Sequence, residues 1–489
     1  MSFLIDEGLT MTNIPHAVSR RTLFRGALLG TLALTPLLAG CDDESPVEAV
    51  HRGLLDDLAE IRAFPTVDEM HEFGARMARE HSDRAALTEV GRSRAGDPVQ
   101  MLSVRARNPR GRVLVVGQPH PNEPIGMATV VALAERLLAR PGALDAAGAD
   151  WFFVLCADPD ATRLNEGWFR GPWTREHYAR NFFRPGGEQQ VEWTFPFRAG
   201  SFAVDAPMPE TRALMAAIDQ VKPTVLASLH NSETGGAYYY ANAGAAPLYP
   251  VLTGLCDIHG IPLHRGEPEI PVAAELSPAV YTLPTARMIY DYVEQAGGDP
   301  AQVVTGGNTG DYASRHGAVL GLAVELPYWR DERAGDTTAG TVSRRDAALR
   351  GLDIRTEMAQ RLQALRSAAE PLTAGPFRDA LDSFLTPMSP EALQAERLQI
   401  ESDPEHQRPA TAAEAFSAVA DAHSLRLRLG GMLLRAMPSG ARVRAEADDL
   451  LKQWCAEADS HSPADPVPIR DLVAVQGKAV LATVAHSLR

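Results

Sequence analysis

The chain has 489 residues, which is enough for two or three domains and a large hydrophobic core. Its composition is that of an ordinary soluble globular protein, with 45% hydrophobic and 22% charged residues. The formal net charge of −15 argues against a nucleic acid as partner, because binding to phosphate groups requires a basic surface. We therefore expect a folded protein that acts on something other than nucleic acid.

Residues 1–40 have the features of a targeting segment, so we exclude them from the fold. Ser19–Arg25 contains a twin-arginine patch, and the apolar stretch Ala27–Leu38 is shorter than the roughly 20 residues that a membrane-spanning helix needs. A Leu-Ala-Gly-Cys sequence follows and ends at Cys41. This order resembles a bacterial twin-arginine export signal joined to a lipoprotein processing box, with Cys41 as the lipidated residue. The resemblance implies an exported lipoprotein, anchored on the outer side of the cytoplasmic membrane (periplasm or cell surface).

An apolar run that ends abruptly in a histidine and a carboxylate organises the rest of the chain. Residues Arg112–Val116 are nearly all aliphatic, which is typical of a buried parallel strand. A glycine and a proline end this strand, and from Ile125 apolar residues recur at helical spacing. His120 and Glu123 therefore lie in the turn at the carboxyl end of a strand, where open α/β sheets bind their ligands.

Two later apolar runs place further ionisable residues at strand ends. Thr224–Leu229 is followed directly by His230, and Val319–Val324 is followed directly by Glu325. Ionisable groups are seldom buried without a partner or a function, so three strands that end in this way indicate one sheet with one site. Two imidazoles and the carboxylate of Glu123 can bind one zinc ion and leave a coordination position open, as catalytic zinc sites do.

After the targeting segment, the chain divides into three parts. Residues 41–65 are an acidic tether with a short helix. Residues 66–345 contain the strands, a hairpin between Leu87 and Val104, and a long aromatic-rich region up to Ala206 that we expect to be irregular but ordered. Residues 346–489 are predicted to form a helical C-terminal domain, in which we identify no residue with a catalytic or metal-binding role. The helices predicted toward the C-terminus are Arg345–Ala369, Pro390–Ile400, Thr411–Met437, Ala441–Ala458 and Ile469–Leu488.

Between about residues 66 and 330 these motifs together resemble the M14 family of zinc metallocarboxypeptidases. His120-Pro121-Asn122-Glu123 is similar to the family's HxxE zinc motif, His230 matches its third zinc ligand, and Glu325 matches its catalytic glutamate. Asp158-Pro159-Asp160 resembles the family's Asn-Pro-Asp-Gly turn. The resemblance implies an α/β fold with a mixed central sheet flanked by helices, zinc as the cofactor and a peptide as the substrate.

The same resemblance implies roles for two arginines. The segment that ends at Arg170 resembles the one whose arginine polarises the scissile carbonyl group. Ala179-Arg180-Asn181-Phe182 resembles the Asn-Arg-Asn-aromatic segment whose arginine holds the terminal carboxylate of the substrate, which implies a substrate-binding role for Arg180 and Asn181. Ala179 stands where the family has asparagine, so a weaker carboxylate clamp is expected. Gly310 stands where the family selects the substrate side chain, and it gives no charge to interpret.

These residues can carry out zinc-dependent hydrolysis of the C-terminal peptide bond. Zinc lowers the pKa of a water molecule to about 7 and polarises a carbonyl group. Glu325 can take the proton of that water and return it to the leaving amine. Arg170 can stabilise the developing oxyanion, and Arg180 can bind a carboxylate with two parallel hydrogen bonds.

Two alternatives stay open. A zinc deacylase of the same fold, acting on N-acyl amino acids, would keep the zinc, Glu325 and a carboxylate-binding arginine. An inactive surface-binding lipoprotein would keep only the fold. The presence of all three zinc ligands together with Glu325 argues against the inactive protein.

Overall fold

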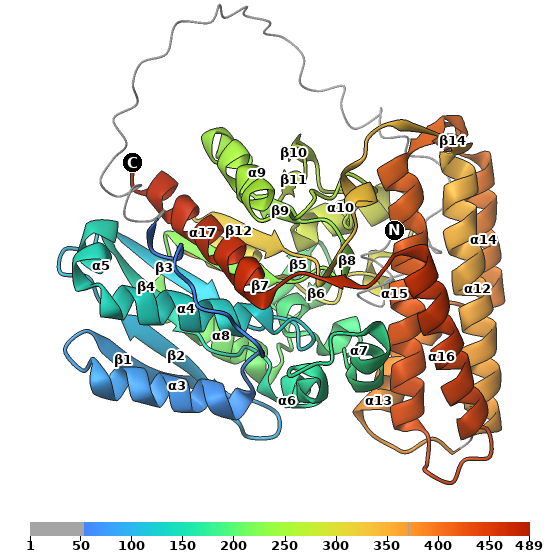
Figure 1. Ribbon diagram of the computed structural model, residues 1–489, viewed down its shortest axis with the longest axis horizontal. Coiled ribbons are helices and arrows are strands. Elements are labelled where there is room, and N and C mark those ends of the chain that lie inside the picture. Colours follow the sequence, from blue (N-terminus) through green and yellow to red (C-terminus); the bar gives the residue numbers. More distant parts are fainter. Residues whose placement is uncertain (1–52, 370) are drawn as a thin grey trace, which may run out of the picture.

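A mixed sheet of nine strands is the centre of the computed structural model, which describes residues 53–369 and 371–489 (Figure 1). The strand order is β1-β2-β4-β3-β7-β12-β9-β11-β10. Strands β4, β3, β7 and β12 are parallel neighbours, whereas β2, β9 and β10 run antiparallel to at least one neighbour. The strands are β1 (Ala85–Arg92), β2 (Pro98–Val104), β3 (Gly111–Val116), β4 (Ala149–Val154), β7 (Val225–His230), β9 (Tyr238–Ala241), β10 (Glu275–Ser277), β11 (Val280–Thr282) and β12 (Leu320–Glu325). The fold class expected from the sequence is therefore confirmed.

The central strands are apolar along their whole length because helices cover both faces of the sheet. In β3, Val113 and Val115 pack into the hydrophobic cluster on one face, while Leu114 and Val116 pack into the cluster on the other. The first face is covered by α3 (Val67–Glu80), α4 (Ile125–Ala139), α9 (Tyr249–Ile258) and α17 (Ile469–Ser487), and the second by α8 (Pro209–Val221) and α11 (Thr309–Ala313).

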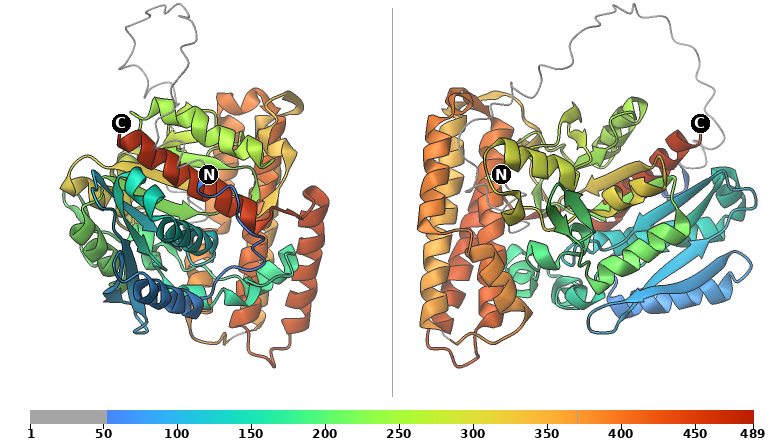
Figure 2. Two further views of the ribbon diagram at one scale, coloured as in Figure 1. Left: turned by 60° about the vertical axis from the view of Figure 1, so that its left-hand side comes forward. Right: turned by 180° about the vertical axis from the view of Figure 1, so that it is seen from behind.

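Five helices form a bundle that stands beside the sheet (Figures 1 and 2). They are α12 (Arg344–Ala368), α13 (Pro376–Leu385), α14 (Pro390–Ser402), α15 (Ala412–Ala436) and α16 (Arg444–His461). The expected helical character of this region is confirmed, although α13 was not predicted. The bundle also packs on α7 (Arg175–Asn181), a helix within the region that we expected to be irregular.

The last helix, α17, leaves the bundle and lies across the sheet, against α4 and α9 (Figure 1). It is apolar nearly all round, as expected for a helix that is covered on most of its surface. A boundary near residue 345 therefore does not separate all C-terminal helices from the sheet, because α17 completes the helical layer of the first face.

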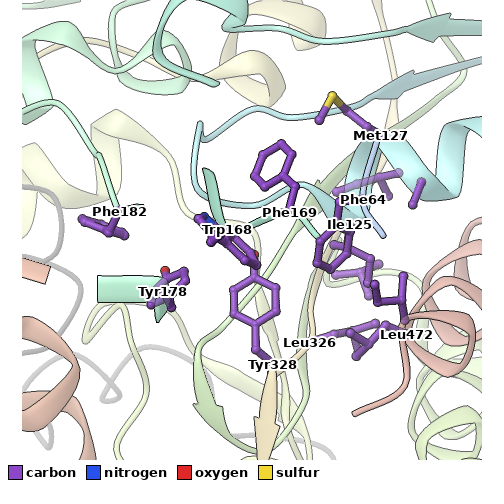
Figure 3. Packing of buried hydrophobic residues seen from close by; sticks show 14 of the residues in the cluster. Phe64, Ile125, Met127, Trp168, Phe169, Tyr178, Phe182, Leu326, Tyr328 and Leu472 are labelled. Carbon is purple, nitrogen blue, oxygen red and sulfur yellow. The ribbon is translucent and has the colours of Figure 1, made fainter. Parts of the chain in front are cut away.

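A cluster of aromatic side chains links the sheet, the loops before it and α7 (Figure 3). Trp168 contacts both Tyr178 and Tyr328 edge to face, with ring centroids 4.9 and 5.2 Å apart. Phe64, from the segment before α3, contacts the same tryptophan at 5.6 Å. The region before residue 206 is thus ordered by packing, as its aromatic content indicated.

The remaining elements are short connections. They are α5 (Pro141–Ala147), α6 (Pro159–Arg163), α10 (Ala286–Gln295), β5 (Phe197–Ala199), β6 (Phe202–Val204), β8 (Thr234–Gly235), β13 (Trp329–Arg330), β14 (Ala339–Ser343), β15 (Pro409–Thr411) and β16 (Asp465–Pro466). Among the described residues no helix combines the length and the hydropathy that crossing a membrane requires. The twin-arginine patch, the apolar stretch and Cys41 lie outside the described residues.

Candidate zinc centre

The turn between β3 and α4 points its two ionisable side chains inward. Gln118 adopts a φ of 56°, in the left-handed region that residues other than glycine rarely occupy. Its side-chain amide donates a 2.8 Å hydrogen bond to the carbonyl of Pro121, which holds the turn closed. His120 and Glu123 are buried as a result. Backbone strain of this kind is typical of functional turns.

Three donor atoms meet at one point in this turn and the neighbouring strand. The Nδ1 atoms of His120 and His230 are 3.2 Å apart. Oε2 of Glu123 lies 3.1 Å from the first and 3.0 Å from the second. A tetrahedral zinc ion with bonds of about 2.05 Å needs ligand atoms about 3.3 Å apart, so this triangle fits zinc closely. The three residues are the group that can hold a metal ion in the described part of the chain.

Glu325 lies beside this triangle because of the strand register. In the parallel pair β7 and β12, Glu325 is the partner of His230. Its Oε1 is 3.8 Å from Nδ1 of His230, and its side chain is 10% exposed. A third carboxylate, that of Glu192, is buried nearby and accepts a hydrogen bond from the hydroxyl of Thr309. The centre therefore concentrates negative charge, which suits a divalent cation.

Burial and mutual contact shift the pKa values of all four central groups. Burial, aided by the nearby Arg184, lowers the pKa of His120 to about 3. Burial also lowers the pKa of His230, but the carboxylates of Glu325 and Glu123 outweigh it and raise the value to about 9. The two histidines hold the pKa of Glu123 well below its usual range against the effect of burial. Burial raises the pKa of Glu325 well above its usual range, although His230 opposes this.

Hydrogen bonds from outside the triangle fix the orientation of its members. Nε2 of His230 is 2.8 Å from the hydroxyl of Ser228, which leaves Nδ1 for the metal. Gln476 of α17 is fully buried, and its Nε2 donates a 3.0 Å hydrogen bond to the backbone carbonyl of His230. The Oε1 of the same amide accepts a 2.8 Å hydrogen bond from Thr129 of α4. The C-terminal helix thus contacts the zinc strand directly.

The bundle also reaches the loop that follows His230. Glu233 is buried, accepts a hydrogen bond from the hydroxyl of Tyr178, and forms a 2.6 Å ion pair with Arg428 of α15. Breaking such a buried pair by removing one partner costs about 3–5 kcal/mol. The C-terminal region, to which the sequence assigned no chemistry, therefore supports the centre from two sides.

The arginine of the centre is Arg184. It is buried, and its Nη1 donates a 3.0 Å hydrogen bond to Oε1 of Glu123, while Nη2 donates a 3.2 Å hydrogen bond to Gln190. The sequence interpretation did not single it out. The available signal was an arginine directly before Pro185 and two glycines, at the end of a run of buried aromatic residues.

The two arginines predicted from the resemblance form their ion pairs outside the triangle. Arg170 is largely exposed and pairs with Glu69 of α3 at 2.6 Å. Arg180 lies on α7 and pairs with Glu176 and with Asp448 of α16, each within 2.8 Å. The structure brings neither of them to the zinc triangle.

Asn181 is also occupied within α7, where its side chain donates to the carbonyl of His177. The physical reason is the bundle, which packs on α7 so closely that a Cβ at Gly431 would lie 1.8 Å from the carbonyl oxygen of Ala179. The segment that resembles the family's carboxylate clamp is thus packed against the helices of the bundle.

A His-x-x-Glu pair and a distant histidine that converge on one point, with a buried glutamate beside them, define a zinc hydrolase centre. The chain belongs to the peptidase M14 family of zinc carboxypeptidases, whose pattern it matches over residues 70–328, more than half of its length. His120, Glu123 and His230 are the zinc-binding triad typical of this family, and zinc is the cofactor. The expectation of an M14-family zinc enzyme is therefore confirmed. No curated protein matches the sequence.

Several solved structures are similar to this chain at low sequence identity. Bovine thrombin-activatable fibrinolysis inhibitor, solved with a tick carboxypeptidase inhibitor, is 11% identical, with a TM-score of 0.37 over 55% of this chain and 88% of its own. Carboxypeptidase A from Helicoverpa armigera is 13% identical, with a TM-score of 0.36 over 59% and 76%. A metallo-carboxypeptidase from Pseudomonas aeruginosa is 17% identical, with a TM-score of 0.33 over 53% and 60%. The family assignment depends on the family match and the zinc triad, and not on these likenesses.

Proposed function

We propose that this enzyme hydrolyses the C-terminal peptide bond of peptides, with Glu325 as the general base. The observation that carries the proposal is the register of β7 and β12, which sets Glu325 beside the zinc ligand His230 at 3.8 Å. A carboxylate at this position can take a proton from water and pass it to a leaving amine. Its burial raises its pKa, which makes it a stronger base than an exposed glutamate.

Each group of the centre has a separate role in this reaction. Zinc held by the triad supplies Lewis acidity toward water and a carbonyl oxygen. Glu325 moves the proton. We assign to Arg184, whose guanidinium contacts the zinc ligand Glu123, the oxyanion-stabilising role first given to Arg170.

A zinc deacylase of N-acyl amino acids is the second candidate. It would use the same zinc triad and Glu325 and would also have to recognise a free carboxylate, so the pairing of Arg180 with Asp448 of the bundle bears on both candidates alike. A carboxypeptidase has to recognise the free terminal carboxylate, and the strongest device for this is an arginine with two parallel hydrogen bonds.

We also propose that the enzyme is exported and anchored to the membrane through a lipid on Cys41. The twin-arginine patch and the sequence that ends at Cys41 support this proposal, since the two signals occur in the order that export and lipidation require. An anchor of this kind needs two or three acyl chains, because a single chain binds a membrane only marginally. The substrate would then be a peptide outside the cytoplasm.

The test is a profile of the products released from a mixed peptide pool, with and without a chelator. The wild-type enzyme should release single C-terminal residues, and the chelator should stop the release. Glu325→Gln should keep the zinc and lower kcat by a factor on the order of 10² or more. Glu332→Gln, an exposed glutamate beyond the same strand, is the matched control and should be fully active. Cleavage of N-acyl amino acids with no action on peptide ends would replace the carboxypeptidase by the deacylase.

A further inference from the structure

The outward face of α9 exposes aliphatic side chains to solvent. Among the residues that the structure describes, three large hydrophobic side chains are exposed, namely Val251, Ile258 and Leu398. Val251 is 43% and Ile258 72% exposed, and both belong to α9. Their spacing is close to two helical turns, so they share one face, and the half-buried Leu255 lies between them. Single exposed aliphatic residues are common on proteins, whereas a stripe of them on one helix indicates a contact surface.

The opposite side of α9 is fixed to the rest of the molecule. Leu252 and Cys256 are buried, and the helix packs against α17. Just past its end, Nδ1 of His259 lies 3.3 Å from a carboxylate oxygen of Asp471 in α17. The helix lies at the outer boundary of the molecule in the views of Figures 1 and 2. Its apolar face therefore points away from the sheet, and the packing of α9 keeps that face from turning inward.

The described chain begins on the same layer of helices. Leu55 packs so closely on α17 that a Cβ at Gly477 would lie 2.4 Å from its Cδ1. The next residue, Asp56, forms a 2.6 Å ion pair with Lys478 of α17. Helix α17 lies between α4 and α9 (Figure 1). Because packed helices are about 8–10 Å apart, the chain begins about 10–20 Å from α9.

The segment before this point is long enough to bring a lipid anchor to α9. Residues 42–52 separate Cys41 from Gly53. A chain of this length spans at most about 40 Å when it is fully extended, which exceeds the distance to α9. A small apolar face binds a bilayer only weakly when the protein is free in solution. An anchor makes the same contact intramolecular, at an effective concentration of about millimolar, so a weak contact is enough.

We propose that the outward face of α9 docks on the bilayer to which Cys41 anchors the protein. This inference rests on the lipid anchor proposed above and adds the surface that faces the membrane. Val251, Leu255 and Ile258 enter the boundary between headgroups and acyl chains, where the apolar face of a helix is stable. Asp257, which is exposed at the edge of this face, stays at the level of the polar headgroups.

The charge and the fold determine how the docked enzyme lies. The net charge of −15 opposes attraction to anionic lipids, so the contact is apolar and forms on neutral lipids as well. Helix α9 covers the first face of the central sheet. Docking through α9 therefore lays the sheet along the bilayer and leaves the edge with the zinc triad open at the side, where a substrate can approach along the membrane surface.

The test measures contact between α9 and acyl chains in the anchored protein. The lipidated protein is placed in phosphatidylcholine vesicles and carries a fluorophore at Ile258→Cys or, as the matched control, at Leu398→Cys. The native cysteines Cys156, Cys256 and Cys455 are buried. Lipids brominated on their acyl chains should quench the probe at position 258 about twofold or more, since a docked helix lies about 5–10 Å into the boundary. The probe at position 398 should keep its intensity.

A second substitution separates docking of the helix from insertion of the probe itself. Val251→Asp should remove the quenching at position 258, because a charge is costly at the apolar boundary. Leu398→Asp adds the same charge on the bundle and should leave that quenching unchanged. Absence of quenching at position 258, or equal quenching at both positions, would overturn the inference. A spectral shift at position 258 that depends on protein concentration without vesicles would overturn it in favour of a second copy of the chain.

The anchor itself is tested separately, by mass spectrometry of the N-terminal peptide that contains Cys41. If Cys41 carries no lipid, the anchoring proposal fails, and a histidine tag in place of Cys41 then binds the protein to nickel-chelating lipid in the same vesicles. Quenching at position 258 supports the docking face in this arrangement too, and its absence overturns it. None of these measurements depends on cleavage of a peptide.

Discussion

Replacing Gln476 by leucine should destabilise the protein and loosen its zinc, although the residue is far from the zinc ligands in the sequence. The amide of Gln476 connects the carbonyl of His230 to the hydroxyl of Thr129, and Gln476 and Thr129 are both fully buried. Leucine leaves both groups without these partners. A buried polar group that loses its partner costs about 1–3 kcal/mol, so two of them cost about 2–6 kcal/mol.

The apolar side chain of leucine offsets about 1–2 kcal/mol of this loss. We therefore expect the free energy of unfolding to fall by about 1–4 kcal/mol, measured as the shift in the midpoint of urea unfolding at unchanged slope. The rate of zinc release to a chelator should rise, since the end of β7 loses an anchor at the ligand His230.

A double variant separates this explanation from a simple packing defect. Thr129→Val alone should destabilise the protein, because it leaves Oε1 of Gln476 without its donor. Combined with Gln476→Leu it should cost less than the sum of the two single changes, by about 1 kcal/mol or more, because no hydroxyl is then left unpaired. Strictly additive effects, or a single change below about 0.5 kcal/mol, would refute the reasoning.

The remaining predictions concern metal, pH, location and the substrate end. His120→Ala should lose zinc in metal analysis, and full occupancy would contradict the triad. Burial, and after it the charge of Glu210, raises the pKa of Asp158 to about 7. The protonated Asp158 carboxyl therefore contributes stability that is fully present below about pH 4 and is lost as the pH rises toward 7. Asp158→Asn should remove this slope from unfolding midpoints measured against pH. Cys41→Ala should move the protein from the membrane to the soluble fraction or leave an unprocessed precursor. Because Arg180 is paired with the bundle, Arg180→Ala should change the preference for a free over an amidated C-terminus by less than about threefold in kcat/KM.

The zinc triad could be predicted from the sequence because the signal is local. Each ligand directly follows, or lies in the turn after, a run of apolar residues, and β7 is buried at every position. The carboxyl ends of parallel strands meet at one edge of a sheet, so the spatial cluster follows from the pattern alone. The position of Glu325 followed for the same reason.

The positions of the arginines and the domain boundary could not be predicted, because they depend on tertiary contacts between segments that are far apart in the sequence. Arg180 and Arg184 lie in one short segment. Arg180 pairs with Asp448 of α16, and this contact with the bundle is not visible in the local sequence. Likewise α17 has the same helical pattern as the bundle helices, and this pattern does not indicate that α17 packs on the sheet. The one local signal was Gln476, a polar residue in a helix that is otherwise apolar on almost every side.

The position of Gln476 has a consequence for the order of events during biosynthesis. A chain is synthesised from its N-terminus, so the strands that carry the zinc ligands emerge long before α17. Until α17 docks, the carbonyl of His230 and the hydroxyl of Thr129 lack their buried partner, and the face of α4 is uncovered. The centre therefore lacks these contacts until α17 has been made. A nascent chain that stops short of α17 carries all the zinc ligands without the contacts that α17 makes to His230 and Thr129.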